Sequence, residues 1–305
     1  MEGLAEKIEE CFGKTLAAAV RRYPDELCEI RIRADKPVVL CLLNRPYFIG
    51  AEGELCPTAC ENAVTVGFDE LKAAFARLCS YSVYKHMQSI GSGFITLPGG
   101  HRVGVCGTAV MSGNDVRAVS EITSLNIRSA KEFPGCCEPL FRSVDLLEGM
   151  LICGAPSSGK TTLLRDAARK LSFEMLRRVS VIDERLELAS SVGGHSGFDV
   201  GLSDVYSGYP KSTAMLLAVR TMSPEFIICD ELTGEDAAAV SRALNCGVSV
   251  ISSVHCTSLQ SALKNPSVKA LTATGAFRKL VFLSGSIPPE ISGIIDTEEV
   301  KNAKA

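Results

Sequence analysis

The sequence predicts an α/β protein in which a mostly parallel sheet forms the C-terminal part and a small α+β domain comes before it. Two observations indicate this. After about residue 147, short apolar runs alternate with helical stretches, which is the pattern of a parallel sheet covered on both faces. Before that point, strands, a hairpin signal and helices occur without such alternation. We therefore expect domains over residues 1–140 and 141–305, close to the roughly 150 residues of a typical domain.

Composition indicates globular domains and gives no sign of a nucleic-acid partner. Of the 305 residues, 46% are hydrophobic and 22% are charged, which excludes a disordered chain. The formal net charge is -3 and is evenly spread, with 16 basic against 19 acidic side chains up to residue 148 and 16 against 16 after it. Duplex-binding domains are usually basic, and few aromatic residues are present for stacking on single strands. We expect no direct nucleic-acid contact.

The cysteines and the apolar runs indicate the cellular compartment in which the protein is expected. The 13 cysteines are scattered without a Cys-x-x-Cys pair, and the close pairs have no ligand at metal spacing, so we expect buried thiols in a reducing cytosol. No apolar run approaches the roughly 18–20 residues that span a bilayer. The first ten residues include four glutamates and no apolar segment, so we expect no secretory signal.

The N-terminal elements are predicted from hydrophobic periodicity and turn residues. Pro98-Gly99-Gly100 separates two apolar segments and predicts a hairpin. The full prediction is helices over residues 2–23 and 69–88, strands over 29–33, 38–43 and 47–49, and a hairpin of 94–97 with 102–105.

Five short apolar runs predict the buried strands of the C-terminal sheet. They are Met150–Cys153, Val179–Asp183, Phe226–Asp230, Val248–Val254 and Lys279–Leu283. Because ligands of such sheets bind beyond the carboxyl ends of the strands, the residues that follow each run are the candidates for a functional site.

The first run leads into a glycine-rich loop. Residues 154–161 fit G-x-x-x-x-G-K-[ST] at every position, between a predicted strand and a predicted helix, as a phosphate-binding P-loop requires. The backbone N–H groups and the helix N-terminus would cradle phosphates, Lys160 would reach the β- and γ-phosphates, and the Thr161 hydroxyl would ligate Mg²⁺. The predicted nucleotide-binding residues are Gly154, Ala155, Pro156, Ser157, Ser158, Gly159, Lys160, Thr161 and Thr162.

Two other strands end in acidic residues. The strand before Asp230-Glu231 has the Walker B pattern, which would place Asp230 beside Mg²⁺ and Glu231 where it can orient water. A second strand ends in Asp183-Glu184, with Glu187 shortly after it. Several acids beside a phosphate site would be costly without a cation, which favours Mg²⁺ binding or water activation. A solvated acidic loop remains the alternative.

A third strand, Val250–His255, ends in small polar residues and a histidine. A polar strand end next to a P-loop commonly senses the γ-phosphate, which makes His255 a candidate catalytic residue. A purely structural histidine is the other possibility.

The order of these motifs resembles the secretion-type ATPases, the hexameric motors of type II and type IV secretion and pilus assembly. Residues 182–187 correspond to their acidic box, residues 253–255 to their histidine box, and residues 218–225, which contain Arg220, to the segment before Walker B. The resemblance implies a RecA-like/AAA ATPase domain with a mostly parallel sheet, using ATP and Mg²⁺ in a homo-oligomeric, hexameric ring.

Three stretches, two of them in the N-terminal part, resemble a narrower family, that of stage III sporulation protein AA and its plastid relatives. The matching stretches are residues 98–104, 124–128 and 229–235. This resemblance implies a cytoplasmic ATPase of the mother cell, peripheral at the forespore membrane, that powers a channel made of membrane-embedded proteins. It also implies that the N-terminal domain closes over the nucleotide and that Arg102 and Arg128 contact its phosphates.

Some assignments stay open at this point. Secretion ATPases usually carry Gly-Glu where this chain has Asp230-Glu231, so either Glu184 or Glu231 could position the water. Arg220 could act in its own subunit or in a neighbouring one. An ATP-gated scaffold with little turnover and an ATP-dependent nucleic-acid-binding RecA-like protein are the alternative functions. The number of acids at the phosphate site favours turnover.

Overall fold

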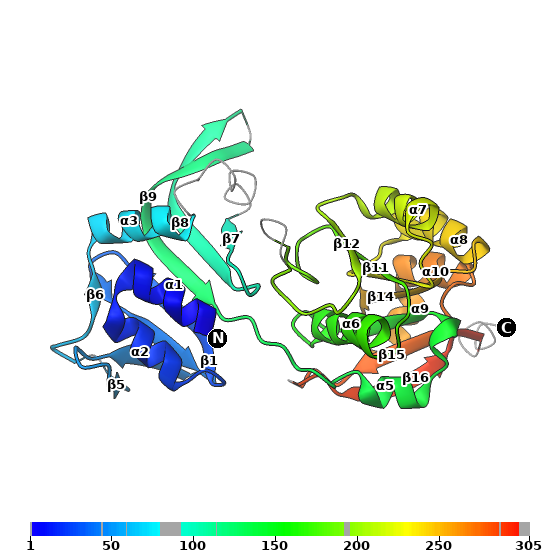
Figure 1. Ribbon diagram of the computed structural model, residues 1–305, viewed down its shortest axis with the longest axis horizontal. Coiled ribbons are helices and arrows are strands. Elements are labelled where there is room, and N and C mark those ends of the chain that lie inside the picture. Colours follow the sequence, from blue (N-terminus) through cyan, green and yellow to red (C-terminus); the bar gives the residue numbers. More distant parts are fainter. Residues whose placement is uncertain are drawn as a thin grey trace. The chain divides into compact units, whose positions relative to one another are not determined.

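The structure is a computed structural model that describes residues 2–43, 45–58, 60–79, 93–113, 115–191, 196–286 and 288–298. The chain divides into two compact units, Met1–Lys131 and Glu132–Ala305 (Figure 1). This division lies a few residues before the predicted one at 140/141. The intervening segment goes with the C-terminal unit because it bonds to helix α6 (Lys160–Arg169), where the Cys137 N–H donates to Asp166 Oδ2 at 2.9 Å.

The described part of the N-terminal unit contains a seven-stranded antiparallel sheet in the order β5-β4-β3-β1-β9-β8-β7. β2 (Lys36–Pro37) and β6 (Thr65–Val66) form a small second sheet. The predicted strands at 29–33, 38–43 and 47–49 correspond to β1, β3 and β4. The strands of the large sheet are β1 (Leu27–Arg33), β3 (Val39–Leu42), β4 (Arg45–Ile49), β5 (Leu55–Cys56), β7 (Phe94–Thr96), β8 (Arg102–Ser112) and β9 (Asp115–Arg128).

Helices α1 (Glu2–Phe12), α2 (Lys14–Arg22) and α3 (Phe68–Leu78) share one hydrophobic core with this sheet. The single helix predicted over residues 2–23 is wrong, because Gly13 has φ of 87°, a left-handed conformation that ends α1 and separates it from α2. The second predicted helix corresponds to α3, which ends at Leu78 with Cys79 as its C-cap, earlier than predicted; residues 80–88 lie outside the described part of the chain.

The predicted hairpin is confirmed, since β7 and β8 pair antiparallel with Thr96 opposite Arg102. β8 then continues into a long hairpin with β9, whose 14 residues were not predicted as one strand. In this hairpin Arg102 lies directly opposite Arg128, so the two arginines predicted to contact phosphates are cross-strand neighbours.

The C-terminal unit has the predicted mostly parallel sheet, in the order β12-β11-β13-β14-β10-β15-β16. All neighbouring strands are parallel except the last pair, β15 and β16. The five predicted strands correspond to β10, β11, β13, β14 and β15; β12 and β16 add one strand at each edge. The strands are β10 (Met150–Gly154), β11 (Val179–Asp183), β12 (Asp204–Ser207), β13 (Phe226–Cys229), β14 (Ser249–His255), β15 (Lys279–Leu283) and β16 (Ile291–Asp296).

Helices cover both faces of this sheet (Figure 1), as a buried parallel sheet requires. One hydrophobic cluster joins the sheet to α5 and α6, and the other joins it to α7, α8 and α10. Among the described residues, none of the helices is long and apolar enough to cross a bilayer. Besides α6, the helices are α5 (Glu138–Ser143), α7 (Lys211–Thr221), α8 (Ala237–Asn245), α9 (Leu259–Lys264) and α10 (Pro266–Ala273), and α6 continues into a π-helical turn, Lys170–Glu174.

Candidate nucleotide-binding site

The strand order of the C-terminal unit brings four strand ends together. β11, β13, β14 and β10 are successive neighbours and all parallel, so their carboxyl ends lie along one edge of the sheet. β14 separates the P-loop strand β10 from the Walker B strand β13. The end of β14 therefore lies between the P-loop and the acids of β13.

The P-loop backbone is left-handed at one serine and one glycine. Ser157 and Gly159 have φ of 62° and 89°, and Gly159 is the N-cap of α6. At Gly154, a Cβ atom would lie 2.2 Å from Ser158 Oγ, so a side chain there would collide with the loop. The buried Ser158 hydroxyl has no hydrogen-bond partner among the described residues. The loop thus contains a donor that the described protein groups leave unsatisfied.

The Lys160 side chain is buried inside this loop. Its Nζ donates to the carbonyl oxygens of Gly154 at 3.0 Å and Ala155 at 2.7 Å, and lies 3.2 Å from His255 Nδ1. Burial lowers the pKa of Lys160, although the carboxylates of Asp230 and Glu231 act in the opposite direction. An ammonium group held by weakly basic carbonyls can exchange them for phosphate oxygens, which are stronger partners.

Asp230 connects the P-loop to the neighbouring strands. Its Oδ2 accepts from Thr161 Oγ1 at 2.8 Å and its Oδ1 accepts from Ser253 Oγ at 2.7 Å. A hydroxyl and a carboxylate are the hard oxygen ligands that Mg²⁺ prefers, so the residues fit this metal. The described residues contain no group of three or more His, Cys, Asp or Glu side chains that could hold a metal by themselves. Oxygen atoms of a nucleotide and of water would therefore have to complete the coordination of Mg²⁺ at this place.

Glu231 lies at the end of the Walker B strand in a strained conformation. Its φ is 41°, and its backbone N–H donates to Ser253 Oγ at 3.1 Å. The carboxylate lies 2.9 Å from Arg185 Nη1 and 3.2 Å from His255 Nε2. His255 is thus within reach of both Glu231 and Lys160. Left-handed backbone at a residue with a long side chain is uncommon and concentrates at functional sites.

Asp183, at the end of β11, has a different environment. It is 1% exposed, and its two oxygens accept four backbone N–H groups, those of residues 187–190, at 2.6–2.9 Å. Arg165 holds the same loop from its carbonyl side, donating to Glu187 O and Leu188 O. Burial lowers the pKa of Arg165 to about 10. Asp183 is therefore occupied in shaping the loop.

Glu184 directly follows β11 and borders a pocket. Its Oε2 pairs with Lys211 Nζ at 3.0 Å. The pocket is lined by the end of β11, the segments that follow β11 and β13, and the start of α7: Ile182, Asp183, Glu184, Arg185, Glu187, Lys211, Asp230 and Glu231. Both candidate water-positioning glutamates, Glu184 and Glu231, thus border the same space.

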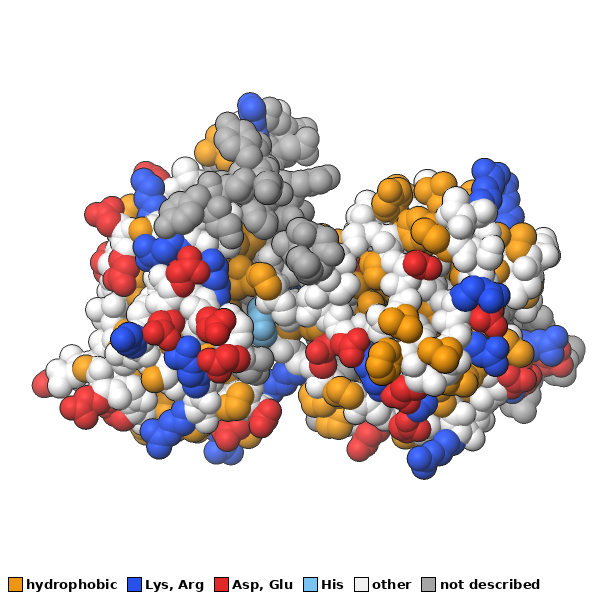
Figure 2. All heavy atoms as spheres, in the orientation of Figure 1, with side chains coloured by type: hydrophobic (Ala, Val, Ile, Leu, Met, Phe, Trp, Pro, Cys, Tyr) orange, Lys and Arg blue, Asp and Glu red, His pale blue; other side chains and the backbone are white. Residues whose placement is uncertain are grey.

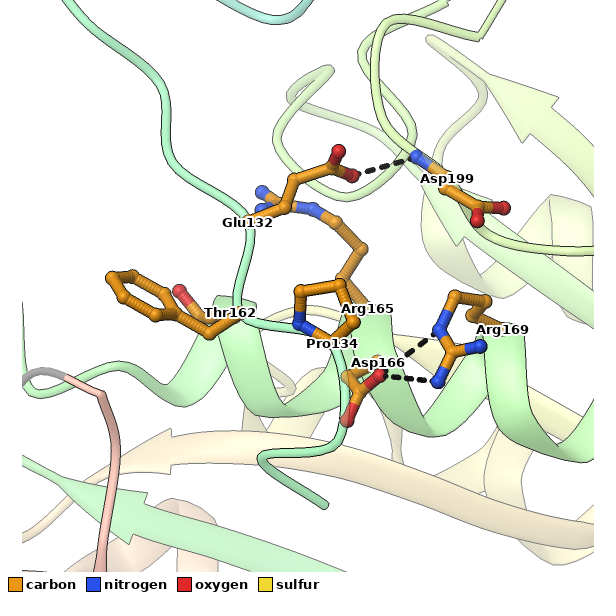
Figure 3. Close-up of a pocket in the computed structure, with 8 residues that line it drawn as sticks. Glu132, Pro134, Thr162, Arg165, Asp166, Arg169 and Asp199 are labelled. Atoms are coloured by element: carbon orange, nitrogen blue, oxygen red, sulfur yellow. Dashed lines mark hydrogen bonds and ion pairs between the residues drawn. The ribbon is translucent and has the colours of Figure 1, made fainter. Parts of the chain in front are cut away.

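A second pocket lies along α6, next to the P-loop (Figure 3). Its wall includes Thr162, the residue after the Mg²⁺-ligand candidate Thr161, together with Glu132, Phe133 and Asp199. Glu132 Oε1 accepts from the Asp199 N–H at 2.7 Å, which ties the segment before α5 to the loop before β12. The remaining lining residues are Pro134, Arg165, Asp166 and Arg169.

The predicted arginines are not brought to the P-loop within the C-terminal unit. α7 begins with Lys211 at the site, and exposed Arg220 lies in its last turn, roughly 14 Å further along the helix. Arg102 lies over the Phe94 ring at 4.9 Å, and Arg128 is exposed on β9. Both belong to the N-terminal unit.

Three residues of the site were not predicted as such. Ser253 could have been found, because it lies two residues before His255 on a strand predicted to end at the P-loop. Arg165 and Lys211 carried no signal in the sequence. Each lies on a helix, and only the packing of that helix against the sheet places it beside the acidic loop.

A family model and one relative match this chain over almost all of its length, and a plant protein matches part of it. The model of the family described as Sporulation stage III, protein AA matches residues 4–301. "Stage III sporulation protein AA" of Bacillus subtilis (strain 168) is 34% identical over 307 residues, which cover 98% of this chain and 96% of that protein. Protein SEEDLING PLASTID DEVELOPMENT 1 of Arabidopsis thaliana is 34% identical over 137 residues, 42% of this chain and 19% of that protein.

Among solved structures, the ATPase DotB of Legionella pneumophila is similar with a TM-score of 0.54 and 15% identity, over 95% of this chain and 81% of that chain. At this identity the likeness shows the fold, so the predicted P-loop ATPase fold is confirmed. The family match includes the N-terminal motifs as well as the P-loop. This protein belongs to the sporulation stage III, protein AA family.

Proposed function

We propose that this protein is a Mg²⁺-dependent ATPase that assembles into a ring and drives transport or assembly at a membrane. The observation that carries the proposal is the hydrogen-bonded series Thr161–Asp230–Ser253–Glu231, which joins the P-loop, the Walker B strand and the strand between them. It holds the groups suited to bind phosphate, ligate Mg²⁺ and orient water at one edge of one sheet. Phosphoryl transfer needs such positioning and charge neutralisation more than covalent chemistry.

Each residue then has a distinct role. Lys160 leaves the carbonyls of Gly154 and Ala155 and binds the β- and γ-phosphates. Thr161 and Asp230 hold Mg²⁺, which supplies neutralisation of phosphate charge. Glu231 orients the attacking water, a role supported by its strained backbone and its place at the strand end. His255, within reach of Lys160 and Glu231, links phosphate binding to the water-positioning group.

The pocket beside Thr162 is where we expect the nucleoside. The phosphates occupy the loop before α6, so the rest of the nucleotide extends past the first turn of that helix. Glu132 and Asp199 border this pocket, and a carboxylate there can accept hydrogen bonds from ribose hydroxyls, as acidic side chains do in other nucleotide sites.

The ring and its setting rest on the resemblance to secretion ATPases. A hexameric ring would let Arg220, which lies away from its own P-loop, act at the site of a neighbouring subunit. The N-terminal unit would supply Arg102 and Arg128 to bound phosphates. The partners would be membrane-embedded channel proteins at the forespore membrane, with the ATPase in the cytoplasm of the mother cell. The charges on the face drawn in Figure 2 are mixed in sign, which gives no support to a nucleic-acid partner.

A steady-state ATPase assay tests the enzymatic part. We expect Mg²⁺-dependent hydrolysis that responds to lipid vesicles or assembly and is indifferent to single-stranded DNA. ATP binding without turnover under all conditions would favour a gated scaffold, and stimulation by DNA would favour a nucleic-acid motor.

Mixing two inactive variants tests the ring. If Arg220 acts across an interface, mixing Arg220→Ala with Lys160→Ala protein creates interfaces that have an intact P-loop on one side and an intact arginine on the other. An arginine supplied in this way is worth about 10³–10⁵ in rate, so recovery would be readily measured. No recovery in mixtures that co-assemble by light scattering would place the arginine in its own subunit.

A further inference from the structure

Lys211 is an unusual residue in the acidic pocket beside the Walker B strand. Its side chain is only 10% exposed, although lysine is among the residues least often buried. It is the first residue of α7, and its Nζ lies 3.0 Å from Glu184 Oε2. The pocket that it lines is also bordered by Asp230 and Glu231.

The start of a helix is an unfavourable place for a cation. A helix N-terminus carries partial positive charge, so the first turn favours acidic side chains and disfavours lysine. The N-cap of α7 is Pro210, which offers no side-chain hydrogen bond that would offset this charge. Burial adds the cost of removing an ammonium group from water.

The five carboxylates that line the pocket attract Lys211, but most of them hold other partners. Asp183 is occupied by four backbone N–H groups, Asp230 by two hydroxyls, and Glu231 by Arg185 and His255. Within the described part of the chain, Lys211 forms an ion pair with Glu184, whose side chain is 36% exposed. Ion pairs with a partner this exposed contribute little to stability. Lys211 is therefore a cation at the edge of this pocket whose ion-pair partner can be exchanged for a ligand.

We propose that Lys211 contacts the terminal phosphate of ATP, as a second cation facing the one on the P-loop. This inference rests on the proposed function of the site. Lys211 borders the same pocket as Asp230 and Glu231, on the side away from Lys160. When the γ-phosphate enters, Lys211 exchanges the Glu184 carboxylate for a phosphate oxygen. The chain would then distinguish ATP from ADP by a residue of its own subunit.

Equilibrium binding of ADP and of a non-hydrolysable ATP analogue, each with Mg²⁺, tests the assignment. Lys211→Met keeps the length of the side chain and removes its charge. We expect it to weaken binding of the ATP analogue about 10–100-fold, the range of a hydrogen bond to a charged group, and to leave ADP binding unchanged. Lys211→Arg should retain most of the preference for the ATP analogue.

Lys170→Met is the matched control. Lys170 is 15% exposed and ion-paired with Glu174, at the far end of α6 from the P-loop. This variant should bind both nucleotides like the wild type. Equal losses of ATP-analogue and ADP binding in Lys211→Met, with a lower melting temperature, would mean that Lys211 only supports α7 and would overturn the proposal. So would an unchanged preference for the ATP analogue. Failure of the wild type to bind either nucleotide would instead refute the proposed function itself.

Discussion

β11 and β13 are neighbouring strands of the C-terminal sheet, and an Asp-Glu dipeptide stands at the carboxyl end of each, yet the two dipeptides have different environments. Asp183 is 1% exposed and is surrounded by backbone N–H groups of its own loop. Asp230 is half-buried and accepts hydrogen bonds from two hydroxyls, one of them in the P-loop. Asp183 therefore stabilises the loop that follows β11, whereas Asp230 connects the P-loop to β14.

The glutamates differ in the same way. Glu231 is held in left-handed backbone and contacts Arg185 and His255, so it is linked to Lys160 through the histidine. Glu184 pairs with Lys211 of α7. Identical dipeptides at adjacent strand ends therefore acquire their roles from the groups that surround them. β14, which lies between β13 and the P-loop strand, supplies Ser253 and His255 to the residues that follow β13.

The largest contrast between the two ends should be in turnover. Glu231→Gln removes the carboxylate charge without changing size, so nucleotide binding should survive while the rate falls by about 10²–10⁴, as for loss of a general base. Glu184→Gln should have a smaller effect, because its partner Lys211 and not the water is affected. Steady-state rates and Mg²⁺-ATP affinities measured side by side decide this. A larger rate defect in Glu184→Gln would reverse the assignment.

For the two aspartates, we expect the free energy of unfolding to depend more on the residue at the end of β11 than on the one after β13. Asp183→Ala leaves four backbone N–H groups without their acceptor, and each buried unsatisfied group costs about 1–3 kcal/mol, so unfolding free energy should fall by about 3 kcal/mol or more. Asp230→Ala frees two hydroxyls that can rotate to other partners, and we expect a loss of about 1 kcal/mol or less. Denaturant unfolding of both variants measures this. Equal losses would mean that Asp230 is as structural as Asp183.

Much of the C-terminal fold could be predicted because each signal there is local. Five apolar runs predicted five buried strands, and the P-loop pattern predicted the turn between β10 and α6. The end of β11 was harder, because the acceptor role of Asp183 depends on a loop with left-handed backbone at Leu186 and Ser190, which no motif signals. The position of Lys211 beside Glu184 depends on where α7 begins relative to β11, and this is set by tertiary packing.

The N-terminal unit was less predictable for similar reasons. Helical periodicity continued across Gly13, and a single left-handed glycine breaks the helix there. The β8–β9 hairpin carries bulges after Cys106 and Val110 that interrupt regular alternation, so its length was not evident. The pairing of Arg102 with Arg128 follows from that hairpin and could not be read from either motif alone.

The most direct test of the central claim, that the P-loop edge of the C-terminal sheet binds and hydrolyses ATP, is calorimetric titration of Mg²⁺-ATP into wild-type protein and into Lys160→Ala. Lys160 holds two loop carbonyls, which water can replace, so the variant should keep its fold and melting temperature. The account predicts clear binding by the wild type and loss of most affinity and all turnover in the variant, because a charge-assisted contact to the β- and γ-phosphates is removed. Unaltered nucleotide binding by Lys160→Ala would contradict it.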